Sequence, residues 1–382
     1  MKEQSLELVS NSNKIKPIIM GDNNPVFTIA EIGLNHNGDL EIGKKMIDAA
    51  HNAGCSSVKF QNFETDHVYI KGEKAGKYKL LGKDIEIYNL HKQLEIEYDF
   101  LSELKKYSEE KGMYFFSAPM GDNALKTLVD LDCDLVKIAS YEVTNLPWIK
   151  KVAEIGKPII MSCGGARLEE VDRAVNEIMK IHDKLALMHC VIKYPAPIYE
   201  SNLKIMNTLK SAFEIPVGFS NNGFEHSDGR IDFQTVPRAA ASMGMDLYEI
   251  HITLDREMEG VDQGFSTEPD ELKSMIDLIN KTRSDYLAGN PIDFDERCIG
   301  SGKKRILECE KYVRDFAYKS IFSIKKISAG EKLDETNIKC LRPGEYIAGL
   351  EPLHYENLIK NSFAKEDIEA FEPITFKDIS FK

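Results

Sequence analysis

The sequence has no hydrophobic run long enough to cross a membrane. Its apolar stretches, such as residues 26–30 and 185–188, are far shorter than the roughly 20 residues that a membrane-spanning helix needs. The N-terminal stretch MKEQSLE also lacks the apolar centre of a secretory signal. Together these absences predict a cytoplasmic protein with no membrane partner.

Positive charge is also in short supply. The chain carries 49 Lys and Arg residues against 62 Asp and Glu residues, which gives a formal net charge of −13. Nucleic acids and anionic membrane surfaces bind basic proteins, because their phosphate charges must be neutralised. The acidic balance therefore argues against nucleic-acid and membrane partners, and small molecules are the expected partners.

A disulfide framework is missing as well. The seven cysteines are an odd number, they are scattered between positions 55 and 340, and no CxxC pair occurs among them. This pattern suits reduced thiols in a cytoplasm. A chain of 382 residues can bury a real core without such cross-links.

What the sequence does contain is a regular alternation of two periodicities. Short β-rich apolar runs predict eight strands, at residues 26–32, 57–61, 114–118, 134–139, 158–162, 185–190, 215–220 and 246–252. Amphipathic stretches predict helices at residues 40–53, 98–111, 123–131, 146–155, 168–181, 202–212, 233–243 and 268–287. Asp39 and Ser201 stand before two of these helices as expected N-caps.

This alternation predicts the fold class. Strands that alternate with helices build parallel sheets, and eight such units in about 260 residues fit a closed (β/α)8 TIM barrel. An open doubly wound sheet would often carry GxGxxG after its first strand, whereas this turn reads EIGLNHNG at residues 31–38. The predicted fold is therefore α/β, a TIM barrel followed by a small β-rich domain.

Changes in composition divide the chain into four parts. Residues 1–25 show no clear period and are expected to form an N-terminal arm, and residues 26–290 are expected to form the catalytic barrel. A run of glycine, asparagine and proline followed by basic residues marks residues 291–318 as a linker. Short strands and turns predict a separate β-rich module at residues 319–382.

Polar side chains gather where the expected strands end. In a (β/α)8 barrel the carboxyl ends of the strands form one mouth, which carries the chemistry. The residues there are Glu31, Lys59, Gln61, Ser117, Lys137, Ser140, Glu142, Ser162, Cys163, Tyr194, Ser220, Asn221, Asn222, Glu249 and His251. Lysines, hydroxyls, carboxylates and a histidine at one mouth predict an anion site with acid–base groups.

Lys59 and Lys137 are the most informative of these residues, because each lies inside an apolar run, VKF and VKI. A buried ammonium group must be paired with a carboxylate or bind an anion, since burying it alone costs too much. The structural alternative is an ion pair with Glu31 or Glu142. In the same way, His251 would also be explained as a hydrogen-bonded core residue.

Several stretches resemble the sialic acid synthase family in their residues and in their order. They are IAEIGLNHNGDL (29–40), VKFQ (58–61), KIASYE (137–142), YPAP (194–197), EIHITLD (249–255) and FSTEPDEL (265–272). After the barrel, ISAGE (327–331) and NIKCLRPG (337–344) are similar to the antifreeze-like SAF domain that follows the barrel in this family. The resemblance covers roughly residues 26 to 380.

The resemblance implies an enzyme that condenses phosphoenolpyruvate with an N-acylated amino-sugar aldehyde, such as N-acetylmannosamine or a related 2,4-diacetamido sugar. The product would be a nine-carbon 2-keto sugar acid of the sialic, legionaminic or pseudaminic type, released together with phosphate. The resemblance also implies a domain-swapped homodimer, in which Arg342 of one subunit reaches over the N-acyl group of the sugar in the other subunit.

The resemblance also implies roles for single residues. The phosphoenolpyruvate-binding positions would be Lys59, Lys137, Ser140, Ser162 and Ser220. The catalytic carboxylates would be Glu31, which handles the sugar and its protons, and Glu142. Gln61, Tyr194 and Arg342 would contact the sugar.

A divalent metal ion, Mn²⁺ or Mg²⁺, is the implied cofactor, because the alkoxide that forms when the aldehyde is attacked needs a Lewis acid. His251 matches one of the two histidine ligands of the family. Where the family reads SDH after the seventh strand, this chain reads SNN at residues 220–222. The second ligand would then be His226 or the amide oxygen of Asn222, unless the metal site is weakened or lost. Three further positions depart from the family pattern: Ala118, Ile192 and Gln263.

The residues leave two other functions open. A barrel lyase or aldolase that acts on a different aldehyde would form a Schiff base on Lys59 or Lys137, because desolvation lowers the pKa of a lysine. A non-catalytic paralogue would bind a sugar or phosphate ligand, and this reading would explain the altered SDH motif.

Overall fold

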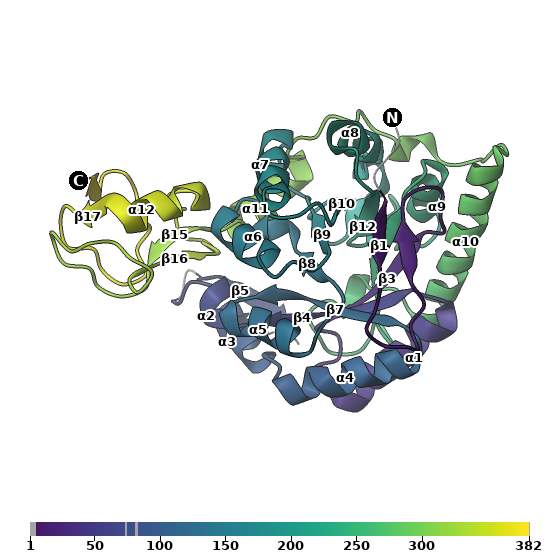
Figure 1. The fold of residues 1–382 in the computed structure, drawn as a ribbon, viewed down its shortest axis with the longest axis horizontal. Coiled ribbons are helices and arrows are strands. Elements are labelled where there is room, and N and C mark those ends of the chain that lie inside the picture. Colours follow the sequence, from purple (N-terminus) through teal and green to yellow (C-terminus); the bar gives the residue numbers. More distant parts are fainter. Residues whose placement is uncertain (1–4, 73–74, 81–82, 382) are drawn as a thin grey trace.

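The computed structural model describes residues 5–72, 75–80 and 83–381. Residues 1–4 of the expected arm and Lys382 of the expected module lie outside the described residues. Parallel strands form the centre of the molecule, helices surround them, and the C-terminal part lies at one side (Figure 1).

The central strands close into a barrel, as the alternating pattern predicts. They are β3 (Phe27–Gly33), β4 (Ser57–Phe63), β7 (Tyr114–Met120), β8 (Val136–Ile138), β9 (Ile159–Ser162), β10 (Leu185–Cys190), β12 (Val217–Asn221) and β14 (Leu247–His251). Neighbours pair in parallel in the order β7-β4-β3-β14-β12-β10-β9-β8. The two ends of this order, β7 and β8, contact each other and close the barrel. The predicted TIM-barrel fold is therefore confirmed.

Helices follow the strands and cover the outside of the barrel. They are α1 (Leu40–Ala53), α4 (Tyr98–Glu110), α5 (Asp122–Asp130), α6 (Leu146–Ala153), α7 (Leu168–Met179), α8 (Lys204–Phe213), α9 (Thr235–Ser242) and α10 (Pro269–Ala288). Asp39 caps α1 as predicted, and its carboxylate accepts hydrogen bonds from the backbone N–H groups of Glu41 and Ile42. Ser201 does not cap α8, because its hydroxyl instead donates to the carbonyl of Ile198 in the preceding turn.

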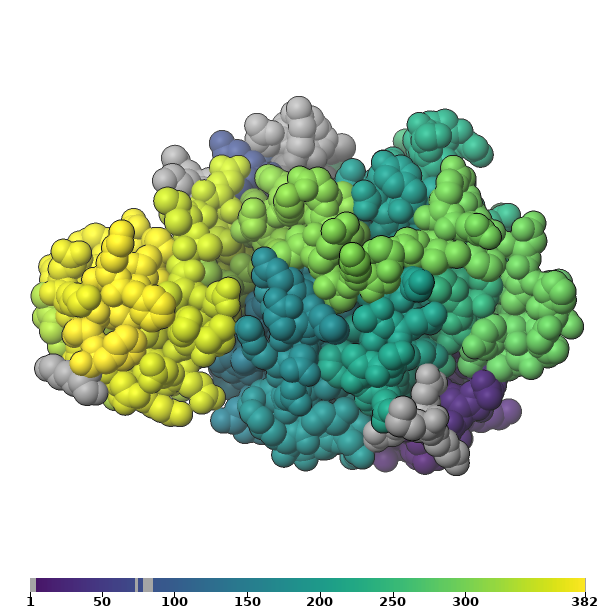
Figure 2. Space-filling view, turned by 90° about the horizontal axis from the view of Figure 1, so that it is seen from above, coloured from purple at the N-terminus to yellow at the C-terminus, as the bar shows by residue number. Residues whose placement is uncertain are grey.

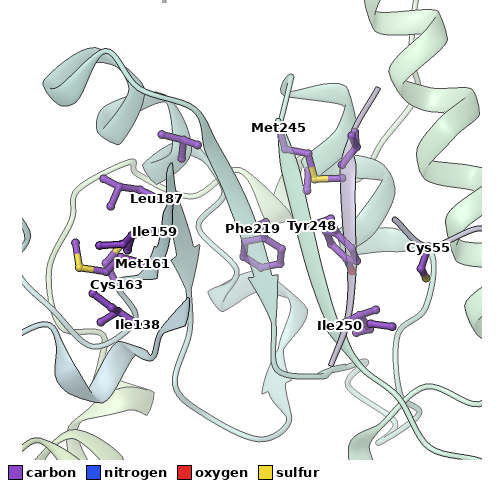
Figure 3. Packing of buried hydrophobic residues seen from close by; sticks show 14 of the residues in the cluster. Cys55, Ile138, Ile159, Met161, Cys163, Leu187, Phe219, Met245, Tyr248 and Ile250 are labelled. Carbon is purple, nitrogen blue, oxygen red and sulfur yellow. The ribbon is translucent and has the colours of Figure 1, made fainter. Parts of the chain in front are cut away.

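Apolar side chains fill the space between the strands and the helices. Figure 3 shows part of this layer, including Ile159 and Met161 of β9, Leu187 of β10 and Ile250 of β14. Ile160 lies between the first two in sequence but belongs to the cluster inside the barrel, because successive side chains of a strand point to opposite faces. The strands are therefore buried on both faces, as the continuous apolar runs in the sequence indicate.

The N-terminal segment, expected to be an arm, contains a short hairpin. β1 (Leu6–Leu8) pairs antiparallel with β2 (Ile18–Met20), and their buried side chains join the apolar cluster inside the barrel. The hydroxyl of Tyr114, the first residue of β7, donates to the carbonyl of Leu8 at 2.8 Å. Since strands begin at the N-terminal end of the barrel, the hairpin closes that end. Three-residue strands are too short to show a period, so the sequence pattern does not reveal them.

Further short elements lie between β4 and β7 and after later strands. They are α2 (Thr65–Val68), β5 (Lys77–Leu80), β6 (Lys83–Glu86), α3 (Ile87–Gln93), β11 (Ala196–Pro197) and β13 (Phe224–Glu225). Turns of 3-10 helix occur at η2 (Ser140–Glu142), η3 (Ile198–Glu200), η4 (Gln263–Phe265), η5 (Glu296–Cys298), η6 (Glu308–Glu310) and η7 (Pro352–His354). None of the helices in the described parts of the chain is long and apolar enough to cross a membrane.

The C-terminal part has an apolar cluster of its own. Its elements are α11 (Lys311–Ala317), β15 (Ser320–Ser323), β16 (Ile338–Leu341), α12 (Tyr355–Asn361), β17 (Ser362–Ala364) and β18 (Ile379–Phe381). β15 pairs antiparallel with β16, β17 pairs antiparallel with β18, and these elements surround the separate cluster. Figure 2 shows this part, in yellow, as a lobe against one side of the barrel. The domain boundaries at residues 290 and 319 stay a prediction.

Candidate active site

A cavity of about 680 Å³ opens at the carboxyl ends of the barrel strands. Most of the residues predicted for the site line this one cavity: Glu31, Lys59, Gln61, Lys137, Ser140, Ser162, Tyr194, Ser220, Asn222, His251 and Arg342. They come from β3, β4, β8, β9, β12 and β14, from the loops that follow the strands, and from the C-terminal part. Residues far apart in the sequence therefore converge here, as the strand-end argument predicts.

Two lysines and two carboxylates form the buried centre of the cavity. Lys59 Nζ lies 2.7 Å from Glu31 Oε2 and 3.8 Å from Glu249 Oε1. Lys137 Nζ lies 3.3 Å from Glu249 Oε2. All four side chains are buried. The lysines are thus paired with carboxylates and also line a cavity, so the structural and the functional interpretations of them are compatible.

The two lysines differ in proton affinity, although both lie beside the carboxylate of Glu249. Burial disfavours the ammonium form of both, but the carboxylates of Glu249 and Glu31 outweigh it at Lys59 and raise its pKa. At Lys137 burial prevails despite Glu249, and with the nearby charge of Lys59 it lowers the pKa. Burial alone would raise the pKa of Glu249, but the two ammonium groups hold it below its ordinary value.

Glu31 is aimed into the cavity by an irregularity of β3. The pairing of β3 with β4 shifts register between Glu31 and Gly33, and Gly33 has a φ of +54°. A Cβ atom at Gly33 would lie 3.2 Å from Glu31 Oε1 and, at this positive φ, would strain the backbone, so glycine suits this position beside the carboxylate. Gln61 Nε2 donates to the same oxygen at 3.0 Å, which fixes the carboxylate between Gln61 and Lys59.

The three predicted serines differ in whether the hydroxyl group already has a hydrogen-bond partner or is free to bind a ligand. Ser220 Oγ donates to Glu249 Oε1 at 3.3 Å, and Ser140 Oγ accepts from the backbone N–H of Gly164 at 3.0 Å. Ser162 Oγ is buried and has no hydrogen-bond partner among the described residues. A buried hydroxyl without a partner is costly, so Ser162 is the serine best suited to bind a ligand atom.

Aromatic rings form one wall of the cavity. The hydroxyls of Tyr141 and Tyr194 lie 2.9 Å apart. The ring of Tyr194 stands edge-on to the His251 ring at 6.2 Å and lies 5.3 Å from the Phe265 ring. The cavity therefore combines a charged centre with an aromatic wall, which is typical of sites for small polar ligands with apolar parts.

Arg342 reaches the cavity from the C-terminal part of the same chain. Its guanidinium carbon lies 5.0 Å and 4.7 Å from the ring centres of Tyr69 and Tyr141, and its Nη1 donates to Tyr69 OH at 2.8 Å. Its Nε is buried without a partner in the described part of the chain. The backbone of Arg342 pairs with Val68 and Ile70 of its own barrel, and the expected entry into another subunit stays a prediction.

Glu142 is not among the described residues that line the cavity, and its expected role beside the reacting carbons stays a prediction. Its Oε1 lies 2.9 Å from Lys319 Nζ, and its Oε2 accepts from Asn145 Nδ2 at 2.7 Å. The Glu142 side chain lies outside the cavity because the tight η2 turn directs Tyr141 into the cavity and the next side chain away from it.

His226 is likewise absent from the described lining of this cavity and lies at separate surface hollows. Its Nε2 is 3.2 Å from Asp232 Oδ1, and Asp232 also accepts from the backbone N–H groups of Thr235 and Val236. The expectation that His226 shares a metal site with His251 stays a prediction, and the cavity lining does not support it.

His251, Asp262 and Asn222 are the remaining donors for a divalent metal ion at the cavity. His251 Nδ1 is buried and has no partner among residues 5–72, 75–80 and 83–381. Asp262 lines the same cavity; burial raises its pKa, and the nearby His251 acts in the opposite direction. Asn222 Nδ2 donates to the carbonyl of Val191 at 3.2 Å, which leaves its amide oxygen for a ligand. Within those same described ranges no group of three or more His, Cys, Asp or Glu side chains forms a metal site. These donors fit only an ion that takes further ligands from water and substrate, as Mg²⁺ does.

Several lining residues were not predicted from the sequence. Tyr69, Tyr141, Asp262 and Phe265 lie in loops or turns after strands, where side-chain direction does not follow a period. The sequence does indicate Glu249 as a site residue, since it stands at a strand end in the EIH motif. Its contact with both lysines could not be predicted, because it depends on strands that are distant in the sequence. Lys319, which contacts Glu142 outside the cavity lining, was not singled out by any pattern in the sequence.

The fold and the cavity define a (β/α)8-barrel protein with a buried cluster of cations and carboxylates at the mouth of the barrel. Comparison with known proteins narrows this class. The model of the NeuB family matches residues 46–290. The chain belongs to the NeuB family, in agreement with the sialic acid synthase resemblance.

Relatives match this chain over nearly their whole length. The spore coat polysaccharide biosynthesis protein SpsE of Bacillus subtilis is 38% identical over 95% of this chain and 96% of its own length. A crystal structure of that protein has a TM-score of 0.84 at 36% identity and covers 98% of this chain and 99% of its own. The N,N′-diacetyllegionaminic acid synthase of Campylobacter jejuni is 33% identical over 89% of this chain and 97% of its own length. A crystal structure of the N-acetylneuraminic acid synthetase of Leptospira borgpetersenii has a TM-score of 0.64 at 30% identity and covers 77% of this chain and 94% of its own.

Proposed function

We propose that this chain is a nonulosonic acid synthase, which joins phosphoenolpyruvate to an N-acylated amino-sugar aldehyde and releases phosphate. The observation that carries the proposal is the pair Lys59 and Lys137, buried at the mouth of the barrel beside Glu31 and Glu249. Relatives named as synthases of legionaminic and N-acetylneuraminic acid support a nine-carbon 2-keto sugar acid of the sialic, legionaminic or pseudaminic type as the product.

Phosphoenolpyruvate carries a carboxylate and a phosphate, so its site must supply positive charge. In this proposal Lys59 and Lys137 bind these groups, Ser162 donates its free hydroxyl, and Ser140 and Ser220 lie beside them. Charge-assisted hydrogen bonds are the strong ones, and a local cluster of cations attracts a small anion to an otherwise acidic protein.

The reaction also needs groups that move protons. The enol carbon of phosphoenolpyruvate bonds to the aldehyde carbon, and the aldehyde oxygen takes up a proton. Water then adds to the cationic carbon that still carries the phosphate, and one proton leaves this water. As the carbon–oxygen bond to the phosphate breaks, the new hydroxyl loses its proton and becomes the ketone, and phosphate departs with the enol oxygen and takes up that proton. Glu31, fixed 2.7 Å from Lys59 and 3.0 Å from Gln61, is the carboxylate assigned to these proton transfers. Glu249, rather than Glu142, is the second carboxylate at the lysines.

The sugar is assigned to the outer part of the cavity. Gln61 and Tyr194 line it, and Arg342 has a buried Nε free to donate to the carbonyl of the N-acyl group. Aromatic rings beside the guanidinium give the acyl methyl group an apolar surface. A homodimer remains a prediction, and Arg342 lines the cavity of its own chain in the described residues.

A divalent ion, Mn²⁺ or Mg²⁺, would be held by His251 and Asp262, with the amide oxygen of Asn222 beside them. It would supply Lewis-acid stabilisation of the alkoxide. Calorimetric titration with Mn²⁺ should therefore show binding that is weakened at least about tenfold by His251→Ala. His226→Ala is the matched control and should bind Mn²⁺ as the unaltered protein does. This site would be contradicted if His226→Ala lost Mn²⁺ binding. It would also be contradicted if His251→Ala bound Mn²⁺ as tightly as the unaltered protein.

The activity is tested by measuring phosphate released from phosphoenolpyruvate with Mn²⁺ and a panel of N-acetylmannosamine and 2,4-diacetamido aldehydes. At least one aldehyde should be turned over, and Lys59→Met should lower kcat/KM by about 10² or more, because charge stabilisation is lost. Lys126→Met, at an exposed surface ion pair, should leave it unchanged. No turnover with any aldehyde would refute the proposal, and trapping of substrate on Lys59 or Lys137 by borohydride would favour a Schiff-base enzyme.

A further inference from the structure

The loop between β14 and α10 forms one wall of the cavity. Met258, Asp262 and Phe265 of this loop line the cavity, and a parallel bridge between Ile252 and Thr267 joins the two ends of the loop. Most of the backbone between these ends is irregular. Such backbone lacks the repeating hydrogen bonds of a helix or sheet, so contacts with neighbouring segments must fix its position.

Four buried polar side chains connect this loop to the loop that follows β3. Asn35 Nδ2 donates to the carbonyl of Ile252 at 2.8 Å and to Ser266 Oγ at 3.0 Å. In return, Gln263 Nε2 donates to the carbonyl of Asn35 at 3.0 Å, and Gln263 Oε1 accepts from Thr253 Oγ1. Asn35, Thr253, Gln263 and Ser266 are each at most 1% exposed. The two amide side chains therefore bind each other's loop, and we call Asn35 and Gln263 the clasp.

The clasp acts on the position of Asp262. Ser266 Oγ accepts from Asn35 and itself donates to the carbonyl of Asp262 at 2.5 Å. Asp262 also directly precedes Gln263, whose amide is held at both its nitrogen and its oxygen. These contacts place the Asp262 carboxylate at the cavity that it lines together with His251.

The neighbouring backbone connects the same loop to two other side chains of the site. The N–H of Thr267 donates to the carbonyl of His251 at 2.9 Å, and the N–H of Ile252 donates to the carbonyl of Glu31 at 2.9 Å. A displacement of the loop would therefore change the position of Asp262 relative to His251 and Glu31.

The clasp leaves one polar atom unsatisfied. Asn35 Oδ1 is buried and has no hydrogen-bond partner in the described part of the chain. A buried polar atom without a partner costs free energy, which an apolar side chain would avoid. Such a cost beside a cavity is typical of a polar network that defines the geometry of a site.

We propose that Asn35 and Gln263 are positioning residues, which hold the β14–α10 loop so that the Asp262 carboxylate and the His251 imidazole meet at the metal site. This inference rests on the proposed function, because it deepens the metal site that is assigned there. Asn35 is outside the described lining of the cavity, so it acts through Asp262 and not on a ligand.

Calorimetric titration with Mn²⁺ tests the clasp. Gln263→Met and Asn35→Leu replace the amides by apolar side chains of similar size. Each should weaken Mn²⁺ binding by roughly 10- to 100-fold, because residues that orient metal ligands contribute this much to affinity. Binding of phosphoenolpyruvate, titrated without metal, should stay within about twofold, since Lys59 and Lys137 keep their partners. The double variant should bind Mn²⁺ no more weakly than the more severe single variant, because both changes open one clasp.

Two further variants complete the series. Asn290→Leu is the matched control, since it removes an exposed amide that donates to Asp285 near the end of α10, and it should bind both ligands as the unaltered protein does. Ser266→Ala removes only the hydroxyl between Asn35 and Asp262 and should weaken Mn²⁺ binding about tenfold, even if a clasp variant fails to fold. Unchanged Mn²⁺ affinity in these variants would overturn the proposal. An equal loss of affinity for Mn²⁺ and phosphoenolpyruvate would reduce the clasp to general stability and overturn it too.

Hydrogen–deuterium exchange gives a readout that needs neither metal nor substrate. The backbone N–H of Ser266 donates to the carbonyl of Gln263 at 3.1 Å, so its exchange reports how firmly the loop is held. Peptides that span η4 and the start of α10 should exchange faster in Gln263→Met than in Asn290→Leu. Equal exchange in the two variants would refute the positioning role. Faster exchange, together with no Mn²⁺ binding by the unaltered protein, would support the clasp and refute only the metal site of the proposed function.

Discussion

Two buried lysines with different proton affinities share one carboxylate in this site. Lys59 has a second carboxylate, Glu31, at 2.7 Å, whereas Lys137 has Glu249 at 3.3 Å and the like charge of Lys59 nearby. The pKa of Lys59 is therefore raised and that of Lys137 lowered. An anionic substrate meets one cation that holds its proton more tightly than an ordinary lysine and one that releases it more readily.

This difference predicts the pH dependence of phosphoenolpyruvate binding. The ammonium form of Lys137 predominates at low pH and is lost as the pH rises through its lowered pKa, so KM for phosphoenolpyruvate should rise towards alkaline pH. Lys137→Arg should remove this rise, because a guanidinium does not titrate in this range. KM measured between about pH 7 and about pH 10 checks the prediction. The same alkaline rise in both proteins would contradict it.

How far single residues could be predicted depends on where they lie. Lys59 and Lys137 were predictable, since a charge inside an apolar run must have a special environment. That Glu142 and His226 lie outside the cavity lining could not be predicted, because a motif tells which turn a residue occupies but not which way that turn points its side chain. The role of Glu249 required the pairing of strands that are distant in the sequence.

At the scale of elements, apolar runs predicted all the barrel strands, since those strands are buried on both faces. The hairpin of β1 and β2 was missed, although it closes the N-terminal end of the barrel. Its strands are too short for a period, and their burial depends on the barrel beneath them. Tertiary packing rather than local pattern defines this element.

The closing role of the hairpin predicts a stability effect. Leu8 is 1% exposed and packs in the cluster inside the barrel, whereas its neighbour Val9 is 62% exposed. Leu8→Ala should lower the free energy of unfolding by about 2–5 kcal/mol, because it removes buried methyl groups and leaves a cavity. Val9→Ala, the matched control, should change it by less than about 0.5 kcal/mol. Urea unfolding measures both, and equal effects would show that the hairpin does not pack as described.

At the scale of the whole molecule, the described chain brings residues of both its parts to one cavity. The barrel brings the lysines and Glu31, and the C-terminal part brings Arg342 into the same cavity. The net charge of −13 is no obstacle to a small anionic substrate, because the positive charge is concentrated where that substrate binds.

Mixed oligomers test whether each chain closes its own cavity. Lys59→Met and Arg342→Met damage different parts of the site, so co-expression with two affinity tags allows hetero-oligomers to be purified. If Arg342 acts within its own chain, each mixed oligomer contains only damaged sites, and its activity should equal the mean of the two variants. In a domain-swapped dimer one of the two sites would be intact. Recovery of activity towards half that of the unaltered protein would therefore contradict closure within one chain.

The central claim, condensation with loss of phosphate, is tested most directly with phosphoenolpyruvate that carries ¹⁸O in the oxygen between carbon and phosphorus. The protein, Mn²⁺, the labelled substrate and the aldehyde that is turned over are incubated, and both products are analysed by mass spectrometry. Because water adds to the carbon that carried the phosphate, the label should leave in the phosphate, with one phosphate formed for each nine-carbon acid. Label retained in the sugar acid, or phosphate formed without a nine-carbon product, would contradict the account.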